Sequence, residues 1–121
     1  MSTIKQKCKY NQGKIYVIRS NKTERIYIGS TCQRLNQRLN GHRSDRRRYN
    51  LNKQTYCTSC EIVELDDHYI ELIQAYPCKS QKELRDREGF YVKLYLDKCV
   101  NKGIPGGTDD YYTALKSTYY N

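Results

Sequence analysis

The chain has 121 residues, with 22 Lys and Arg against 13 Asp and Glu, so its formal net charge is +9. This length fits one domain with one modest core and excludes two independently folded domains within these residues. The charge predicts a polyanionic partner, of which nucleic acid is the commonest, although a plain basic protein or one that binds acidic membranes has the same composition.

The sequence has no membrane-spanning segment, no signal segment and no cysteine pattern typical of a zinc site, and these features indicate where the protein is located. No apolar run approaches the roughly 20 residues of a membrane-spanning helix, and no charged-then-apolar signal segment opens the chain. Six cysteines are present, but only Cys57 and Cys60 form a CxxC pair, and a zinc site needs a second pair of ligands at a short spacing. We therefore expect free thiols and an intracellular protein of the cytoplasm or nucleus that is not secreted and has no membrane partner.

Residues 1–13 are polar and basic without hydrophobic periodicity, so we expect a flexible basic arm there that can touch a phosphate backbone and takes no part in catalysis. Residues 14–19 and 25–29 are β-branched and aromatic runs separated by a turn-like segment, which predicts an antiparallel hairpin. Because side chains alternate along a strand, a suitable register puts Tyr16 and Tyr27 on the same face.

After the hairpin the apolar residues change to a helical period. Leu35, Leu39 and His42 lie at i, i+4 and i+7, and Arg38 lies at the shoulder of this stripe, where we expect it half-buried beside the sheet. Residues 30–33, Ser-Thr-Cys-Gln, fit a capping box for this helix, although a loop before Leu35 fits as well.

Basic residues gather on this helix and at its expected end. A solvated face that complements the helix dipole is one interpretation, and a surface that follows a nucleic-acid backbone is the other. The predicted nucleic-acid-binding residues are Arg34, Arg43, Arg46, Arg47 and Arg48.

The middle of the chain predicts a loop over residues 49–56, a short helix or strand over 61–65, and a turn over 66–68. Residues 69–76 predict a third strand, internal to the sheet and ended by Pro77. Ser80 and Glu83 fit a second capping box, which opens a helix to about residue 97.

Glu88 lies on the apolar face of this last helix, in line with Leu84 and Tyr91. An ionised carboxylate against a core needs an arginine, a bound cation or a raised pKa to compensate. A salt bridge to Arg85 or Arg87 is the structural interpretation, and a cation site is the functional one. A short extended segment follows at residues 99–101, and residues 105–121 are a tyrosine-rich tail or linker.

These motifs resemble the GIY-YIG nuclease superfamily, whose name spells the two strand motifs found here as Lys-Ile-Tyr at 14–16 and Tyr-Ile-Gly at 27–29. Lys14 stands where the name has glycine. The resemblance extends through Arg38 and His42 to a late glutamate and asparagine, Glu88 and Asn101. It implies an α/β (α+β) nuclease domain over residues 14–104, with a small three-stranded antiparallel sheet flanked by helices.

The resemblance implies a metal-dependent endonuclease that hydrolyses DNA phosphodiester bonds. In it, Tyr16 helps to deprotonate the attacking water, Arg38 clamps the scissile phosphate, and Glu88 holds one Mg²⁺ or Mn²⁺ per active site. A phenol is a poor base at neutral pH, so neighbouring groups or a cation must favour the phenolate.

The remaining site residues have supporting roles in this interpretation. Tyr27 contacts phosphate or positions Tyr16, Asn101 orients the substrate or Glu88, and His42 is either an acid or base or a buried, satisfied histidine. DNA is the partner, with an attached or separate DNA-targeting domain and no small-molecule cofactor, and the chain is free-standing or a fragment of a homing-type or viral-type endonuclease. The alternative function is a non-catalytic basic DNA- or RNA-binding module on the same fold.

Overall fold

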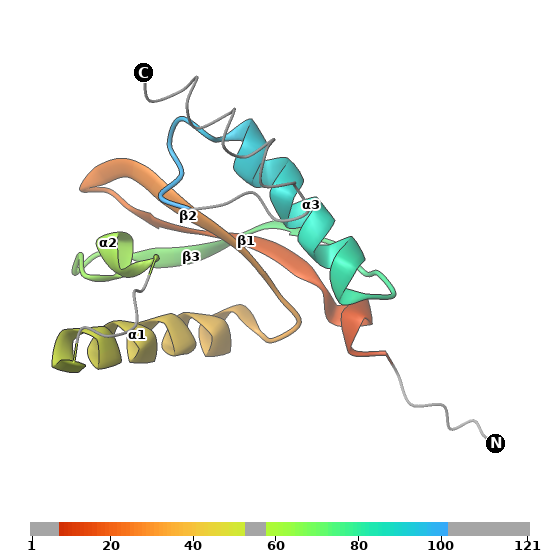
Figure 1. Cartoon of the computed structure of the whole chain (residues 1–121), viewed down its shortest axis with the longest axis horizontal. Helices are drawn as coiled ribbons and strands as arrows, with labels where there is room; N and C mark the ends of the chain where they lie inside the picture. Colours follow the sequence, from red (N-terminus) through yellow and green to blue (C-terminus); the bar gives the residue numbers. More distant parts are fainter. Residues whose placement is uncertain (1–7, 53–57, 102–121) are drawn as a thin grey trace.

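A three-stranded antiparallel sheet in the order β2-β1-β3 lies between the helices (Figure 1). The computed structural model describes residues 8–52 and 58–101. The expected sheet with flanking helices is confirmed. The elements are the 3-10 helix η1 (Lys9–Gln12), β1 (Lys14–Ser20), β2 (Thr23–Thr31), α1 (Leu35–Asn52), α2 (Cys60–Val63), β3 (Tyr69–Ala75) and α3 (Gln81–Leu94).

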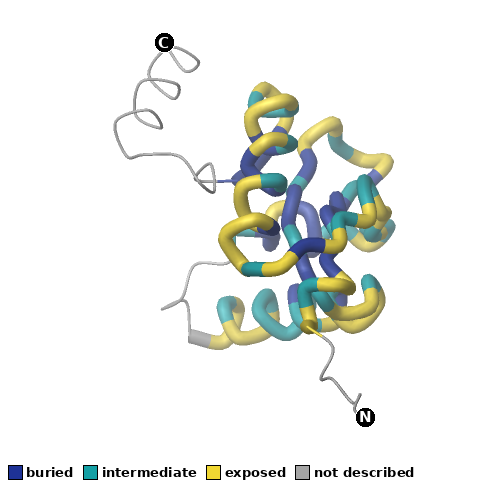
Figure 2. Tube along the Cα trace, turned by 90° about the vertical axis from the view of Figure 1, so that its right-hand side faces the viewer, coloured by how far each residue is buried: buried dark blue, intermediate teal, exposed yellow. Residues whose placement is uncertain are grey.

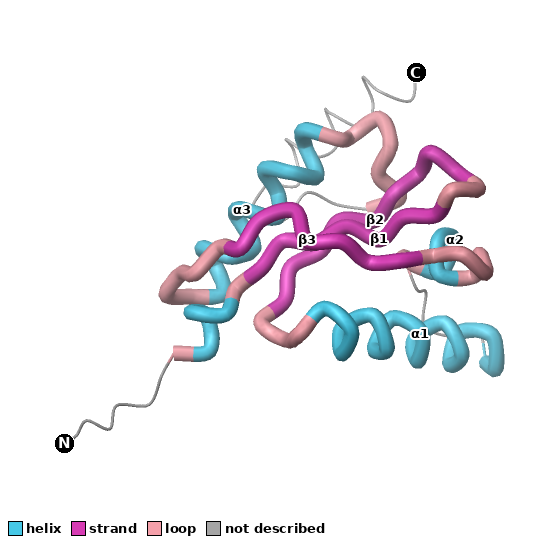
Figure 3. Tube along the Cα trace, turned by 180° about the vertical axis from the view of Figure 1, so that it is seen from behind, coloured by secondary structure: helices cyan, strands magenta, loops and turns pink. Residues whose placement is uncertain are grey.

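The central strand β1 pairs with β2 on one side and β3 on the other, and side chains on both of its faces are buried. Its side chains alternate between two apolar clusters. Ile15 and Val17 pack with Leu84 of α3, whereas Tyr16 and Ile18 join the cluster that includes residues of α1 and α2. The helices α1 and α3 therefore cover opposite faces of the sheet (Figure 3), and the buried residues follow its strands (Figure 2).

The hairpin of β1 and β2 confirms the predicted register of the two tyrosines. Tyr16 pairs with Gly29, and Ile18 pairs with Tyr27. Directly paired residues project to the same face of a sheet, so both phenols lie on the α1 face.

The prediction that residues 69–76 form an internal strand is wrong, because β3 is an edge strand. Leu72 is 50% exposed there, and Glu71 pairs at the surface with Arg19. The polar residues that interrupt the β3 sequence are those of a half-solvated edge, whereas the unbroken apolar run of β1 belongs at the centre.

Both ends of α1 differ from the prediction. Ser30 and Thr31 still pair with β1, so the capping box at 30–33 does not form and the helix begins at Leu35 after a short loop, which was the open alternative. The helix continues to Asn52, so residues 49–52 are helical rather than looped, and residues 53–57 are outside the described part.

The second capping box is confirmed in part. The Glu83 backbone N–H donates to Ser80 Oγ at 3.2 Å, and the Glu83 carboxylate accepts from the backbone N–H of Lys79 instead of that of Ser80. The helix α3 ends at Leu94, shorter than predicted, because residues 95–98 form a turn. Residues 60–63 form a helical turn, so the segment for which both a short helix and a strand were open is a helix.

The end of the predicted flexible arm belongs to the folded domain. Lys9–Gln12 form η1, and the Tyr10 carbonyl accepts from the backbone N–H groups of Gly13 and Cys78. Residues 1–7 of the arm and the predicted tail at 105–121 lie outside the described residues.

Four cysteines are free as expected: Cys8, Cys32, Cys78 and Cys99. Cys60 is disulfide-bonded, which corrects the expectation of a free thiol at that position, and Cys57 is outside the described residues. Among the helices of the described part, none has the length and apolar character to cross a bilayer.

Residues 99–101 form the expected extended segment and run along β2. Cys99 makes a parallel bridge with Ile26, and the Val100 N–H donates to the Ile26 carbonyl at 2.8 Å. The Asn101 side chain then binds the Ile28 backbone twice, accepting from its N–H at 3.0 Å and donating to its carbonyl at 2.7 Å. Asn101 thereby holds the strand segment that carries Tyr27 and Gly29.

We predict that Asn101→Ala destabilises the fold by about 2 kcal/mol, because two buried backbone groups lose their partner. Urea unfolding followed by circular dichroism measures the change. Asn36→Ala, at an exposed position of α1, is the matched control and should change stability little. Equal stability of the two variants would contradict this role of Asn101.

Candidate active site

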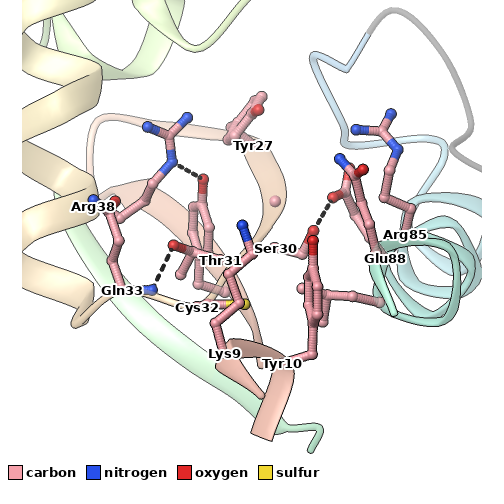
Figure 4. A pocket seen from close by; sticks show the side chains of 14 residues that line it. Lys9, Tyr10, Tyr27, Ser30, Thr31, Cys32, Gln33, Arg38, Arg85 and Glu88 are labelled. Carbon is pink, nitrogen blue, oxygen red and sulfur yellow. Dashed lines mark hydrogen bonds between the residues drawn. The ribbon is translucent and has the colours of Figure 1, made fainter. Parts of the chain in front are cut away.

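A pocket of about 600 Å³ opens where β2 meets α1, α3 and η1 (Figure 4). Four of the predicted site residues line it: Tyr16, Tyr27, Arg38 and Glu88. The tyrosines and Arg38 come from the α1 side of the sheet, and Glu88 comes from α3 on the other side. His42 lies behind Tyr16, and Asn101 lies away from the pocket, on the Ile28 backbone.

The Tyr16 phenol is the centre of the hydrogen bonding. Its oxygen lies 2.6 Å from His42 Nε2 and accepts from Arg38 Nε at 3.3 Å. The residue is only 1% exposed, and burial, assisted by the neighbouring Tyr27, raises the pKa of the phenol, while Arg38 opposes this rise. Tyr16 is therefore a neutral phenol at neutral pH.

Gly29 leaves room for the Tyr16 ring. A Cβ atom at position 29 would lie 2.4 Å from the Tyr16 hydroxyl oxygen and 2.5 Å from Cζ, far inside contact distance. The ring crosses directly over its cross-strand partner, so any side chain there would displace it. Position 29, the last of the Tyr-Ile-Gly motif, must therefore be glycine because the Tyr16 ring lies too close for a side chain, and not because a turn requires it.

His42 is 3% exposed and has a partner for each ring nitrogen. Nδ1 lies 2.8 Å from Ser59 Oγ, and Nε2 faces Tyr16. Burial, and then the charge of Arg38, lower the pKa of His42 to about 4, so the imidazole is neutral at pH 7. Arg38 can only donate to the Tyr16 oxygen, so we assign the phenol proton to the bond with Nε2 and the ring proton to Nδ1.

Ser59 is a member of this site that the sequence did not reveal. It is 2% exposed and precedes α2, with its hydroxyl directed to His42 instead of capping the helix. Its contact with His42 depends on how α2 packs against α1, and no local spacing encodes that packing. The only sequence signal is its place inside the CxxC motif.

Tyr27 completes the aromatic wall. Its ring centroid lies 6.4 Å from that of Tyr16 and 5.0 Å from that of His42, with the His42 contact edge-on. Burial, followed by the charge of Glu88, raises the pKa of Tyr27. Its side chain is thus a neutral hydrogen-bonding group at the pocket.

Glu88 is 8% exposed and accepts a hydrogen bond from Ser30 Oγ at 2.5 Å. Burial raises the pKa of this carboxyl, and the Ser30 bond and the charges of Arg85 and Arg38 oppose the rise. Within residues 8–52 and 58–101 Glu88 forms no ion pair, so the structural interpretation of a salt bridge is wrong.

The donor set around Glu88 fits a hydrated cation. The described residues contain no group of three or more His, Cys, Asp or Glu side chains that could enclose a metal ion. Glu88 is the one acidic residue that lines the pocket, and its hydroxyl neighbour Ser30 lines it too. A hard divalent cation that keeps most of its waters needs one such carboxylate, and its charge would offset the cost of the buried one.

The structure also assigns a role to Lys14, where the family name has glycine. Its Nζ donates to the backbone carbonyls of Gln12 and Gln33, at 2.9 and 3.0 Å. Lys14 thereby ties the loop between β2 and α1 to the start of β1, at the rim of the pocket.

The five predicted nucleic-acid-binding arginines lie outside the pocket lining, with Arg34 directly before α1 and the other four on it. Arg43 donates to His68 at 3.0 Å, Arg47 to Ser44 at 3.1 Å, and Arg48 forms an ion pair with Asp45. The cations that line the pocket besides Arg38 are Lys9 and Arg85, which the sequence analysis did not select.

We predict a loss of stability in acid that depends on His42. The folded pKa, about 4, lies below the ordinary 6.5, so this stability is present above pH 6.5 and is lost as the pH falls toward 4. The difference corresponds to about 3 kcal/mol. Urea unfolding across this range should show a weaker pH dependence for His42→Gln than for the wild type.

His68→Gln, which changes the only other histidine, is the matched control and should keep the wild-type pH dependence. The same pH dependence in His42→Gln and the wild type would overturn this account of His42.

We predict that Glu88→Gln is more stable than the wild type at pH 8 without divalent metal. The folded pKa is raised, so ionisation of Glu88 above that pKa opposes folding, whereas the amide carries no charge. The gain should shrink as the pH falls and the wild-type carboxyl becomes protonated. Thermal unfolding measures it, with Glu24→Gln on the exposed part of β2 as the control. A gain that does not vary with pH would contradict the raised pKa.

Comparison with known proteins agrees with the motifs. The model of the GIY-YIG catalytic domain matches residues 12–101, well over half of the chain. No curated protein matches the chain, and no solved structure does. The matched range includes every predicted catalytic residue and all the described strands and helices except η1, of which it includes only Gln12. The chain belongs to the GIY-YIG family of nuclease domains.

Proposed function

We propose that the chain is a metal-dependent endonuclease that hydrolyses phosphodiester bonds of DNA. One observation carries the proposal: the Tyr16 phenol lies between the acceptor Nε2 of His42 and the donor Nε of Arg38, at a pocket that Glu88 enters from the other side. A base, a phosphate clamp and a cation ligand therefore meet in one space, as hydrolysis of a phosphodiester requires. An intracellular location is part of the proposal.

In the first step, Tyr16 acts as a relay and not as a preformed phenolate. Its oxygen takes a proton from the attacking water while its own proton passes to His42 Nε2, which leaves an imidazolium and a hydroxide that bonds to phosphorus. Transfer of the Tyr16 proton to His42 before the water attacks would be uphill by at least about 6 pKa units, roughly 8 kcal/mol, even for a phenol with its ordinary pKa. The proton therefore moves as the hydroxide oxygen forms its bond.

Arg38 couples substrate binding to this relay. Its charge is the second cause of the low pKa of His42. A phosphate bound to the guanidinium offsets that charge, so the pKa of His42 rises toward its ordinary value when the substrate is in place. The same fork-shaped group then stabilises the charge that develops on the phosphorus oxygens.

Glu88 is the residue that would hold the divalent cation, and Mg²⁺ or Mn²⁺, one per site, is our proposal. Such a cation supplies Lewis-acid stabilisation of the departing 3′ oxygen. Ser30 orients the carboxylate through its hydrogen bond, so that one carboxylate oxygen keeps a fixed direction. Target choice would come from an attached or separate DNA-targeting domain.

We predict that the purified protein nicks supercoiled plasmid at low salt with Mg²⁺ or Mn²⁺. EDTA, Arg38→Ala and Glu88→Gln should each reduce nicking by about a hundredfold or more, since each removes charge stabilisation from the transition state. Arg25→Ala, which breaks a surface ion pair with Glu61, should nick like the wild type.

If the wild type binds plasmid but does not cut it under any of these conditions, the catalytic proposal fails. The alternative, a non-catalytic basic nucleic-acid-binding module, would then be the better account. In that case the Tyr16 and His42 pair is a buried structural contact.

A further inference from the structure

Among the described residues, three cations line the pocket against a single carboxylate. Arg38 reaches it from α1, Lys9 from η1 and Arg85 from α3. Figure 4 shows Arg38 on one side of the pocket, and Arg85 beside Glu88 on the other. One scissile phosphate bound to Arg38 leaves the Glu88 side with two cations and one carboxylate, even before a divalent cation adds its charge.

Lys9 and Arg85 are available to a ligand. Both are exposed, and within the described part of the chain neither forms an ion pair. Three other cations near this end of the molecule are engaged: Lys14 by two carbonyls, Lys82 by Asp86, and Arg87 by Gln74.

The position of Arg85 follows from the helix. It lies three residues before Glu88, so both side chains project from the same face of α3 toward the pocket. Its charge opposes the rise that burial causes in the pKa of Glu88, and also the rise in the pKa of Tyr27, which lies on a different element. The guanidinium therefore acts across the pocket and not only on its helical neighbour.

The position of Lys9 is fixed by the packing of η1. The Tyr10 carbonyl accepts from the Gly13 N–H at 3.1 Å and from the Cys78 N–H at 2.9 Å, and the Tyr10 ring packs against the apolar core. At Gly13 a Cβ atom would lie only 2.6 Å from the Tyr76 carbonyl oxygen, so the chain approaches the strand end closely here. Lys9 Nζ lies 5.2 Å from the centre of the Tyr10 ring, at the pocket rim.

We propose that Lys9 and Arg85 bind backbone phosphates next to the scissile one, so that a nucleic-acid strand crosses the pocket from Arg38 toward α3. This inference rests on the proposed function and adds the path of the substrate to it. It places the neighbouring phosphates on the Glu88 side, where the cations of the pocket are not already paired. The competing role for Arg85 is to neutralise Glu88 alone.

Binding in the absence of divalent metal separates the two roles. A fluorescently labelled DNA oligonucleotide is titrated by fluorescence anisotropy, in EDTA, over a series of salt concentrations. Each phosphate contact contributes about 0.9 to the slope of log Kobs against log salt for duplex DNA. Lys9→Ala and Arg85→Ala should each weaken binding and reduce the slope by about 1, and the double variant should reduce it by about 2.

Lys82→Ala is the matched control, because it removes a cation from the same helix at a position that does not line the pocket. Its slope should be that of the wild type. Cleavage by Arg85→Ala should show a raised KM with little change in kcat, as expected when binding common to the ground and transition states is lost.

One contrary result is that Arg85→Ala binds metal-free DNA with the wild-type affinity and slope, and differs only in needing a higher metal concentration for cleavage. In that case Arg85 only neutralises Glu88, and the inference is wrong. If the wild type binds with the expected slopes but never cuts, the phosphate path stands and the proposed hydrolysis fails. If the wild type cuts and both variants bind like it, the hydrolysis stands and the phosphate path fails.

Discussion

The hydrogen bond between Tyr16 and His42 Nε2 is the contact on which the rest of the site depends. It requires a central strand that carries a large side chain into a buried position, a partner strand with glycine opposite it, and a helix packed so that an imidazole meets the phenol. Gly29 supplies the space, α1 supplies His42 together with Arg38, and Ser59 beside α2 holds the other ring nitrogen. Without this bond Tyr16 would have no proton acceptor, and the proposed relay could not operate.

Burial keeps several groups of the site away from their ordinary charge states. It raises the pKa values of Tyr16 and Glu88 and lowers that of His42 to about 4. Such shifts oppose ionisation in the free protein and are reversed by ligands of the right sign. An anion at Arg38 favours proton uptake by His42, and a cation at Glu88 favours its carboxylate. In the proposed function, the resting site is complementary to a phosphodiester with a divalent cation, and its charges separate only when both are bound.

Local patterns were sufficient for the parts of the fold that local chemistry decides. The β-branched and aromatic runs of β1 and β2, the Ser80 cap and the stripe that contains Leu39 and His42 all predicted structure that is present. The pattern misled where tertiary pairing overrides it: Ser30 fits a helix cap but stays in the sheet and bonds to Glu88 instead. The edge position of β3 and the contact of Ser59 with His42 depend on packing between distant segments, so no single stretch of sequence encodes them. Neither Lys9 nor Arg85 was among the predicted nucleic-acid-binding residues, because a cation lining a pocket has the same local sequence as one on a solvated face.

The state of the His42 ring tests the central claim most directly. Long-range proton–nitrogen correlation spectra report which ring nitrogen carries the proton, and His68→Gln assigns the two histidines. The account predicts a proton on Nδ1, a bare Nε2 that accepts from Tyr16, and no titration of His42 from about pH 8 down to about pH 5, since its folded pKa is near 4. A proton on Nε2 would show that His42 cannot take the Tyr16 proton in the way the hydrolysis requires. Titration of the ring near its ordinary value of 6.5 would contradict the account of burial and Arg38 lowering the pKa of His42.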